Sequence, residues 1–109
     1  MPDTWIIDMT QYLDASGRLP SLPGPVHKLA EFFGAIVASV SSESLGTPMS
    51  TLVRCRRHPG RKKCIGEILA VIERRRLRVE WECPVCGDNG VIHNWRGTVW
   101  DCSARGVLQ

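Results

Sequence analysis

The chain has 109 residues and a formal net charge of +3, with 43% hydrophobic and 23% charged residues. This length fits one domain, or a small domain with an arm, and excludes a large multidomain enzyme. The composition is that of a globular protein and excludes wholesale disorder. The longest apolar stretch, Leu29 to Val40, is interrupted by Glu31 and is far shorter than the roughly 20 residues of a membrane span, so we expect no membrane partner.

The cysteine content is the second informative feature of the composition. The first residues, Met1 to Trp5, lack the basic start and apolar run of a signal peptide, so we expect a cytoplasmic protein. The cytoplasm is reducing, and the five cysteines therefore favour metal or redox chemistry over disulfides.

Charge is distributed unevenly along the chain. Residues 1–53 hold two basic and five acidic side chains, whereas residues 54–109 hold twelve basic and six acidic ones. Six of the ten residues from Arg54 to Lys63 are Arg or Lys, and a second basic run follows from Arg74 to Arg78. Clustered cations favour a polyanionic partner, because they neutralise phosphates and release counterions. The alternative is a solvated loop whose charges keep the protein in solution.

The first half of the chain predicts one helix. Thr4 to Asp8 is compatible with an edge strand and Thr10 to Asp14 with the start of a helical turn, and the pattern does not decide between them. The three prolines between Leu19 and Pro25 require an extended backbone. Apolar residues then recur at spacings of three and four, which predicts an amphipathic helix over Val26 to Val40. Pro25 is expected as the first residue of this helix.

Strand signals fill the second half of the chain. A stretch of small and polar residues, Ser41 to Pro48, is typical of a linker. Alternation then places Thr51, Val53 and Cys55 on one face of a strand. Further strands are expected at residues 64–73, 77–83 and 91–95, with turns at residues 74–76, 87–90 and 96–98. Together these segments predict an antiparallel meander of three or four short strands.

The strongest local signal is the segment Cys83-Pro84-Val85-Cys86-Gly87. Two thiolates separated by two residues can hold one ion from a tight turn, and the glycine permits the left-handed backbone that aims amide N–H groups at the sulfurs. The segment resembles the zinc knuckle of zinc ribbons and rubredoxin-like modules. Because a structural zinc site is tetrahedral, the resemblance implies two further ligands.

Two ligand pairs are open for the other half of the site. Cys55 and His58 would form a Cys-x2-His pair, separated from the knuckle by 24 residues. Cys55 and Cys64 would instead leave and re-enter a hairpin, with their sulfurs facing each other across neighbouring strands. We favour the second pair because its sulfurs can face each other in this way, and the surrounding cations can offset the negative charge of four thiolates. His58 is then a loop residue, and Cys102 is a packing residue or a free thiol. The predicted zinc ligands are Cys55, Cys64, Cys83 and Cys86.

Other interpretations of the cysteines are weaker. Five unrelated reduced cysteines would not be expected to include a Cys-x2-Cys-Gly unit at the end of an alternating strand. Cys83 to Cys86 also resembles the dithiol of glutaredoxin-type proteins, which precedes a helix. Gly87 and Gly90 disfavour a first helical turn, so the sequence argues against this redox interpretation. Iron in place of zinc stays open, because a four-thiolate site can hold either metal.

The segment after the knuckle, Gly87 to Asp101, contains Trp95 and Trp100 beside Arg96. It resembles the C-terminal signature of a group of short uncharacterised bacterial proteins, in which a knuckle is followed by Gly-Val-Ile and Trp-Asp; this resemblance implies no function. The two tryptophans could stack on the bases of single-stranded nucleic acid, or could cover a thin core and shield the sulfurs from water. Trp81 is expected in the core from its parity on the strand.

The sequence therefore predicts an α+β protein in which an N-terminal arm and helix (residues 1–47) pack on a small antiparallel zinc-ribbon-like sheet (residues 48–109). We expect a non-catalytic zinc-binding module that presents a basic hairpin loop to nucleic acid through Arg54, Arg56, Arg57, Arg61, Lys62 and Lys63. A zinc-stabilised protein-interaction module is the second hypothesis, and an iron or thiol redox protein the third. Catalysis is not expected, because a closed four-cysteine site leaves no position for water, and His93, Asp101 and Cys102 match no catalytic motif.

Overall fold

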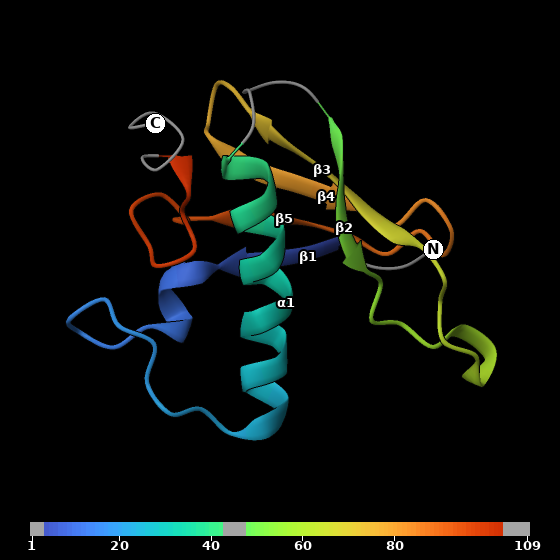
Figure 1. Cartoon of the computed structure of the whole chain (residues 1–109), viewed down its shortest axis with the longest axis horizontal. Coiled ribbons are helices and arrows are strands. Elements are labelled where there is room, and N and C mark those ends of the chain that lie inside the picture. The colour runs from blue at the N-terminus through green and yellow to red at the C-terminus, as the bar shows by residue number, and fades with distance from the viewer. Residues whose placement is uncertain (1–3, 43–47, 104–109) are drawn as a thin grey trace.

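The computed structural model describes residues 4–42 and 48–103, which form one α-helix and one five-stranded sheet. The elements are β1 (Thr4–Asp8), η1 (Met9–Tyr12), α1 (Gly24–Ser41), β2 (Met49–Arg54), η2 (Pro59–Arg61), β3 (Glu67–Glu73), β4 (Arg78–Glu82) and β5 (Asn89–His93), where η marks a 3-10 helix. The strand order is β1-β5-β4-β3-β2 (Figure 1). This architecture confirms the predicted α+β class.

The N-terminal strand makes the sheet mixed. β1 runs parallel to β5, with Ile7 opposite Ile92, whereas the other neighbouring strands are antiparallel. The predicted antiparallel meander is present as β2, β3, β4 and β5, but the expected wholly antiparallel sheet is wrong, because β1 adds a fifth, parallel strand. The two N-terminal alternatives are both present: the strand is followed by η1, where the Asp8 side chain accepts a hydrogen bond from the Thr10 N–H at 2.9 Å.

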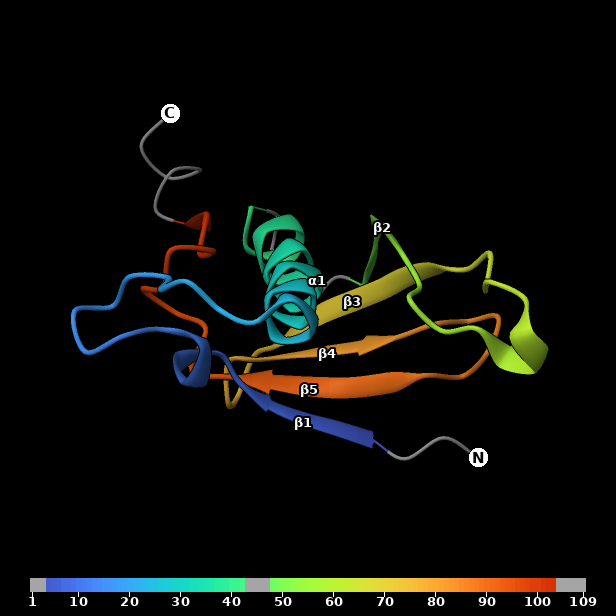
Figure 2. The same cartoon turned by 90° about the horizontal axis from the view of Figure 1, so that it is seen from below.

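Helix α1 covers one face of the sheet, so the molecule has two layers (Figure 2). The helix begins at Gly24, one residue earlier than predicted, and its buried residues follow the predicted spacing of three and four. Its phenylalanines meet the sheet at Trp81, whose ring centroid lies 5.7 Å from that of Phe32 and 5.9 Å from that of Phe33. Each apolar side chain buried between the layers contributes about 1.5–3 kcal/mol.

Two tryptophans of the C-terminal segment also belong to the core. Trp95 is 3% exposed, and its indole N–H donates to the carbonyl of Leu77 at 2.6 Å. Trp100 is half-buried against Gly34, whose lack of a side chain provides the space. Trp95 follows β5 and therefore lies at the end of the sheet opposite to Cys83, which follows β4. Trp95 thus neither stacks on a ligand nor shields the cysteine sulfurs.

Several strand and turn boundaries in the structure differ from the predicted ones. The returning strand begins at Glu67, so Cys64 lies in the loop before it. The chain reverses between β4 and β5 at Pro84 to Cys86, and Asn89 and Gly90, predicted as turn residues, are already part of β5. Residues 43–47 of the predicted linker lie outside the described residues. No helix in the described ranges is long and apolar enough to cross a membrane.

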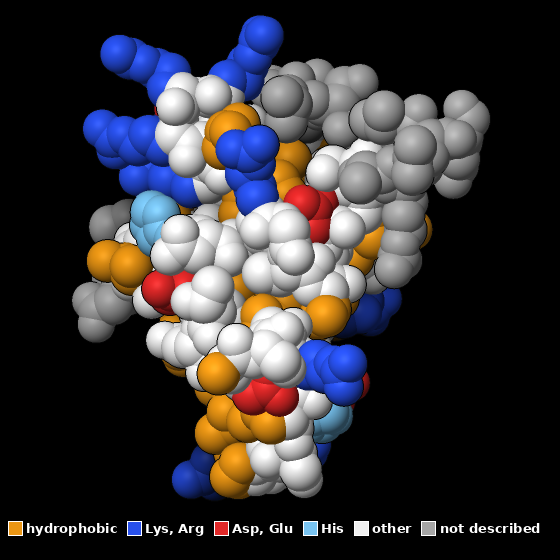
Figure 3. All heavy atoms as spheres, turned by 90° about the vertical axis from the view of Figure 1, so that its left-hand side faces the viewer, with side chains coloured by type: hydrophobic (Ala, Val, Ile, Leu, Met, Phe, Trp, Pro, Cys, Tyr) orange, Lys and Arg blue, Asp and Glu red, His pale blue; other side chains and the backbone are white. Residues whose placement is uncertain are grey.

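The two basic runs lie at opposite ends of the sheet. The first, residues 54–63, joins β2 to β3 at the end where β4 ends, and we call it the basic loop. The second surrounds the turn at residues 74–77 between β3 and β4. Figure 3 shows Lys and Arg side chains gathered over that turn at one corner of the molecule. The two surfaces can therefore contact different ligands.

Candidate metal centre

Four cysteines from three segments of the chain meet at one end of the sheet. Their Sγ atoms all lie within 4.8 Å of one another, and the residues are Cys55, Cys64, Cys83 and Cys86. The Cys55–Cys86 and Cys64–Cys83 sulfur pairs are both 3.6 Å apart. A zinc ion at about 2.3 Å from each sulfur of a tetrahedron would place the sulfurs about 3.8 Å apart. The donor set and its spacing therefore fit a tetrahedral metal ion.

The first two thiols lie on the two arms of the basic loop. Cys55 follows β2 directly, and its N–H donates to the carbonyl of Gly66 at 2.9 Å. Cys64 lies on the returning arm, and its N–H donates to the carbonyl of Arg57 at 2.9 Å. These two hydrogen bonds close the base of the loop. The predicted arrangement across a hairpin is present, and each loop sulfur also lies 3.6 Å from one sulfur of the knuckle.

The other two thiols belong to a tight turn after β4. The N–H of Gly87 donates to the carbonyl of Cys83 at 2.9 Å, and the N–H of Cys83 donates to the carbonyl of Asp88 at 2.7 Å. Gly87 has a φ of 83°, the left-handed conformation that glycine adopts without a steric cost. The turn leads into β5 rather than into a helix, as the sequence predicts. It therefore lacks the helix N-terminus that activates a redox dithiol.

The protein environment shifts the pKa values of the thiols in different directions. Burial raises the pKa of Cys55 to about 12 and raises that of Cys86 above its ordinary value. Burial acts in the same direction on Cys83, but the backbone N–H groups of Cys86 and Val85 donate to its sulfur, and the resulting pKa lies below the ordinary value. A metal cation would favour the thiolate form of all four residues, and its binding would release protons.

Gly66 and Asp88 support the site, and the sequence interpretation missed both. A Cβ atom on Gly66 would overlap the Sγ atom of Cys83, so this position requires a glycine. Asp88 is 1% exposed; its Oδ1 accepts a hydrogen bond from the Trp5 indole at 3.3 Å and lies 3.6 Å from the Arg57 guanidinium. Asp88 thereby ties β1 and the basic loop to the knuckle. Neither residue stands out in the sequence, because each contact depends on a segment distant along the chain.

The remaining candidate ligands lie apart from the cluster. His58 is exposed near the tip of the basic loop and is not a member of the metal-ligating group found among the described residues. Cys102 is half-buried, and its sulfur lies 3.6 Å from the carbonyl of Trp100. The structure thus brings together the four cysteines favoured from the sequence.

The six cations predicted to bind nucleic acid are all exposed on the basic loop and its arms. Two of them contact the protein body: the Arg56 guanidinium lies 5.8 Å from the centroid of the Trp5 ring, and Arg57 pairs with Asp88. The other four make no ion pair within residues 4–42 and 48–103; they are Arg54, Arg61, Lys62 and Lys63.

The chain matches no family model, and no curated protein or solved structure is significantly similar to it. The resemblance to a zinc knuckle therefore depends on the motif and on the cluster that the structure shows.

Proposed function

We propose that this chain is a zinc-binding module that presents its basic loop to nucleic acid and catalyses no reaction. The observation that carries the proposal is the position of Cys55 and Cys64 at the base of that loop. An ion held by these thiols and by the knuckle would fix the base of the loop, while the cations between the two ligands stay exposed to solvent. Metal binding would in this way order the surface that contacts the partner.

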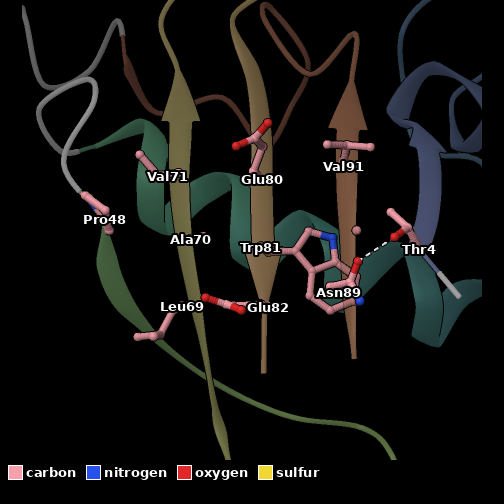
Figure 4. Close-up of a pocket in the computed structure, with 11 residues that line it drawn as sticks. Thr4, Pro48, Leu69, Ala70, Val71, Glu80, Trp81, Glu82, Asn89 and Val91 are labelled. Carbon is pink, nitrogen blue, oxygen red and sulfur yellow. Dashed lines mark hydrogen bonds between the residues drawn. The ribbon is translucent and has the colours of Figure 1, made fainter. Parts of the chain in front are cut away.

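The distribution of charge supports an approach from the loop end. The face of the sheet that α1 leaves open carries a hollow of about 430 Å³, and its lining includes Glu80 and Glu82 beside Leu69, Val71 and Val91 (Figure 4). Carboxylates and aliphatic side chains do not attract phosphates. The basic loop, by contrast, offers cations without ion-pair partners in the described ranges. Nucleic acid is therefore expected at the loop and not on the open face.

A structural role for the metal follows from the ligand set. Four cysteines complete a tetrahedral shell, so a bound zinc ion would keep no position open for water or substrate. Zinc would supply folding free energy, because its ligands come from segments that the unfolded chain does not hold together. The thiols also need a reducing compartment to stay available as ligands, which is consistent with the cytoplasm.

The test is binding of a fluorescent single-stranded oligonucleotide at several salt concentrations, measured by anisotropy on the metal-loaded protein. For the unmodified protein we expect the logarithm of affinity to fall with the logarithm of salt concentration, by about 0.7 per phosphate contacted on a single strand. The variant that neutralises the loop carries Arg54→Gln, Arg61→Gln, Lys62→Gln and Lys63→Gln. Its salt slope should be smaller by up to about 2.8, which corresponds to the loss of four phosphate contacts.

The matched control removes the same number of charges from the opposite end of the sheet, with Arg74, Arg75, Arg76 and Arg96 changed to Gln. Both variants must keep the metal content of the unmodified protein. Equal weakening in both variants would mean that net charge alone drives binding, and unchanged binding in the loop variant would remove the nucleic-acid proposal.

A second candidate, a protein-interaction module, is favoured by exposed apolar side chains at the metal end. Leu52 and Ile65 are each 74% exposed and Val85 is 59% exposed. Apolar surface of this kind marks contact sites for other proteins. Such association would tolerate salt, in contrast to binding of a polyanion, and changing these three residues to Ser should abolish it without reducing oligonucleotide affinity.

A further inference from the structure

A second candidate binding site lies at the end of the sheet opposite to the cysteines. A hollow of about 450 Å³ opens there between three segments that are distant in sequence: η1, the turn between β3 and β4, and the segment after β5. It is lined by Thr10, Arg75, Arg76, Leu77, Asn94 and Arg96. Three of its six lining residues are arginines, so the hollow is strongly cationic.

These arginines have no carboxylate partners in the described part of the chain. None of the guanidinium groups of Arg75, Arg76 and Arg96 has a carboxylate oxygen within 4.0 Å among residues 4–42 and 48–103, although the backbone N–H of Arg76 donates to the Glu73 carboxylate at 2.6 Å. Arg78, by contrast, pairs with Glu80 at 2.8 Å. Three guanidinium groups around one hollow repel one another, and an anion between them would relieve that repulsion. Each guanidinium also offers the planar pair of N–H donors that suits a phosphate.

Hydrogen bonds between the three segments hold the hollow in shape. The buried Trp95 indole donates to the carbonyl of Leu77, which joins the segment after β5 to the turn between β3 and β4. The Asp8 carboxylate accepts from the Thr10 hydroxyl at 2.6 Å and from the Asn94 amide at 3.1 Å, which joins η1 to the segment after β5. Asp8, Glu73 and Asp101 carry negative charge near these arginines, but none of their carboxylates pairs with a guanidinium group that lines the hollow.

The backbone around the hollow is unusual as well. Leu77 has a φ of 52° and Asn94 a φ of 55°, and both line the hollow. The left-handed region is uncommon for residues other than glycine, above all for a side chain as large as leucine. Such conformations cluster at functional sites, where the surrounding structure maintains them. Here the two residues are held by the same hydrogen bonds that join the three segments.

From the unpaired arginines, the cross-linked segments and the backbone conformation, we infer that this hollow binds the phosphate group of a small phosphorylated molecule. The volume of about 450 Å³ accommodates a group larger than a phosphate ion, and Leu77 provides an apolar contact for the rest of the ligand. The phosphate would accept hydrogen bonds from the guanidinium groups of Arg75, Arg76 and Arg96. This site is separate from the metal centre, so it goes beyond the proposed function and does not depend on it.

The test is a titration of the full-length, metal-loaded protein, followed by the amide resonances in two-dimensional NMR spectra. The probes are inorganic phosphate, a nucleoside monophosphate, and a single-stranded oligonucleotide without terminal phosphates. We expect saturable shifts with the monophosphate, largest at Arg75, Arg76, Asn94 and Arg96. The double variant Arg75→Gln/Arg96→Gln should weaken binding by about tenfold or more, because two charge-assisted contacts are lost.

The matched control is Arg74→Gln, which removes a charge from the same turn at a residue that does not line the hollow. We expect it to keep the affinity within about threefold, as for an exposed charge outside a contact. Equal loss in Arg74→Gln and in the double variant would overturn the proposal in favour of diffuse attraction. The absence of saturable shifts at about 10 mM monophosphate, or shifts at these residues with the oligonucleotide alone, would overturn it too. Loss of oligonucleotide binding at the basic loop would leave these outcomes unchanged, so the two proposals fail separately.

Discussion

At the scale of single residues, Gly66 is the position where the metal centre has no room for a side chain. In Gly66→Ala the new methyl group would overlap the Sγ atom of Cys83, so that sulfur or the loop must shift. We expect a lower zinc affinity and a loss of about 1–3 kcal/mol in the free energy of unfolding, as for other overpacked sites. Competition with a chromophoric chelator measures the affinity, and urea denaturation measures the stability.

The control for this substitution is Gly24→Ala, because a Cβ atom there meets nothing within 4 Å. Its free energy of unfolding should stay within about 0.5 kcal/mol of that of the unmodified protein. If Gly66→Ala bound zinc as tightly as Gly24→Ala does, the arrangement of the sulfurs described above would be incorrect.

The choice of ligands predicts a clear difference between neighbouring substitutions in the basic loop. Cys64→Ser should abolish stoichiometric zinc binding, because it removes one of four clustered donors. His58→Ala and Cys102→Ser should each retain one zinc ion per chain, because both residues lie outside the cluster. Elemental analysis of the purified variants measures the content. Loss of zinc in His58→Ala together with its retention in Cys64→Ser would support the alternative Cys-x2-His pair.

The raised pKa values predict the direction of the pH dependence of metal binding. Burial raises the pKa of Cys55 to about 12 and raises that of Cys86 as well, so without metal these thiols hold their protons at neutral pH. Metal must displace those protons, and acid therefore competes with it. The apparent zinc affinity should rise with pH between about 6 and 8, by up to tenfold per unit for each proton released. A chelator competition series that showed no dependence on pH would contradict protonated ligands.

Much of the candidate site could be predicted from local spacing. The interval between Cys83 and Cys86, followed by a glycine, specifies a turn that can hold two ligands, and strand parity placed Cys55 on a buried face. Cys64 could be preferred to His58 because the predicted strands place Cys55 and Cys64 at their loop-proximal ends, where the two sulfurs can approach each other. Gly66 and Asp88 could not be found in this way, because their roles depend on Cys83 and on Trp5, which the sequence does not place beside them.

At the scale of secondary-structure elements, the buried indole of Trp95 connects the segment after β5 to the turn between β3 and β4 through one hydrogen bond. Trp95→Phe would remove the donor and leave the carbonyl of Leu77 without a partner, at a cost of about 1–3 kcal/mol. Trp81→Phe is the matched control, because the buried Trp81 indole N–H has no hydrogen-bond partner in the described structure. Both substitutions remove the same atoms. Urea denaturation should therefore show the larger loss for Trp95→Phe, and equal losses would mean that the hydrogen bond contributes nothing.

Predictability also differs between elements. Helix α1 could be predicted because its apolar spacing of three and four is a property of one segment. The pairing of β1 with β5 could not, because Thr4 and Asn89 are far apart in sequence and no local pattern relates parallel strands. The turn after β4 was expected at residues 87–90, where two glycines lie close together, whereas the knuckle itself reverses the chain.

At the scale of the whole molecule, the metal centre is joined to three strands of the sheet. Cys83 and Cys86 follow β4, Cys55 follows β2, and Asp88 contacts Trp5 of β1. A structural zinc ion contributes an apparent free energy of about 10–16 kcal/mol in small modules, which equals or exceeds the stability of a typical domain. Removal of the metal should therefore unfold the sheet and not only its loops.

Metal analysis combined with chelation tests most directly whether a bound metal ion holds the sheet together. The protein, purified under reducing conditions, is analysed for its metal content, and its secondary structure is followed by circular dichroism before and after addition of a strong chelator. We expect one zinc ion per chain and a loss of sheet structure that added zinc reverses. A protein that carries no metal and keeps the same spectrum and the same unfolding midpoint in the chelator would contradict this expectation.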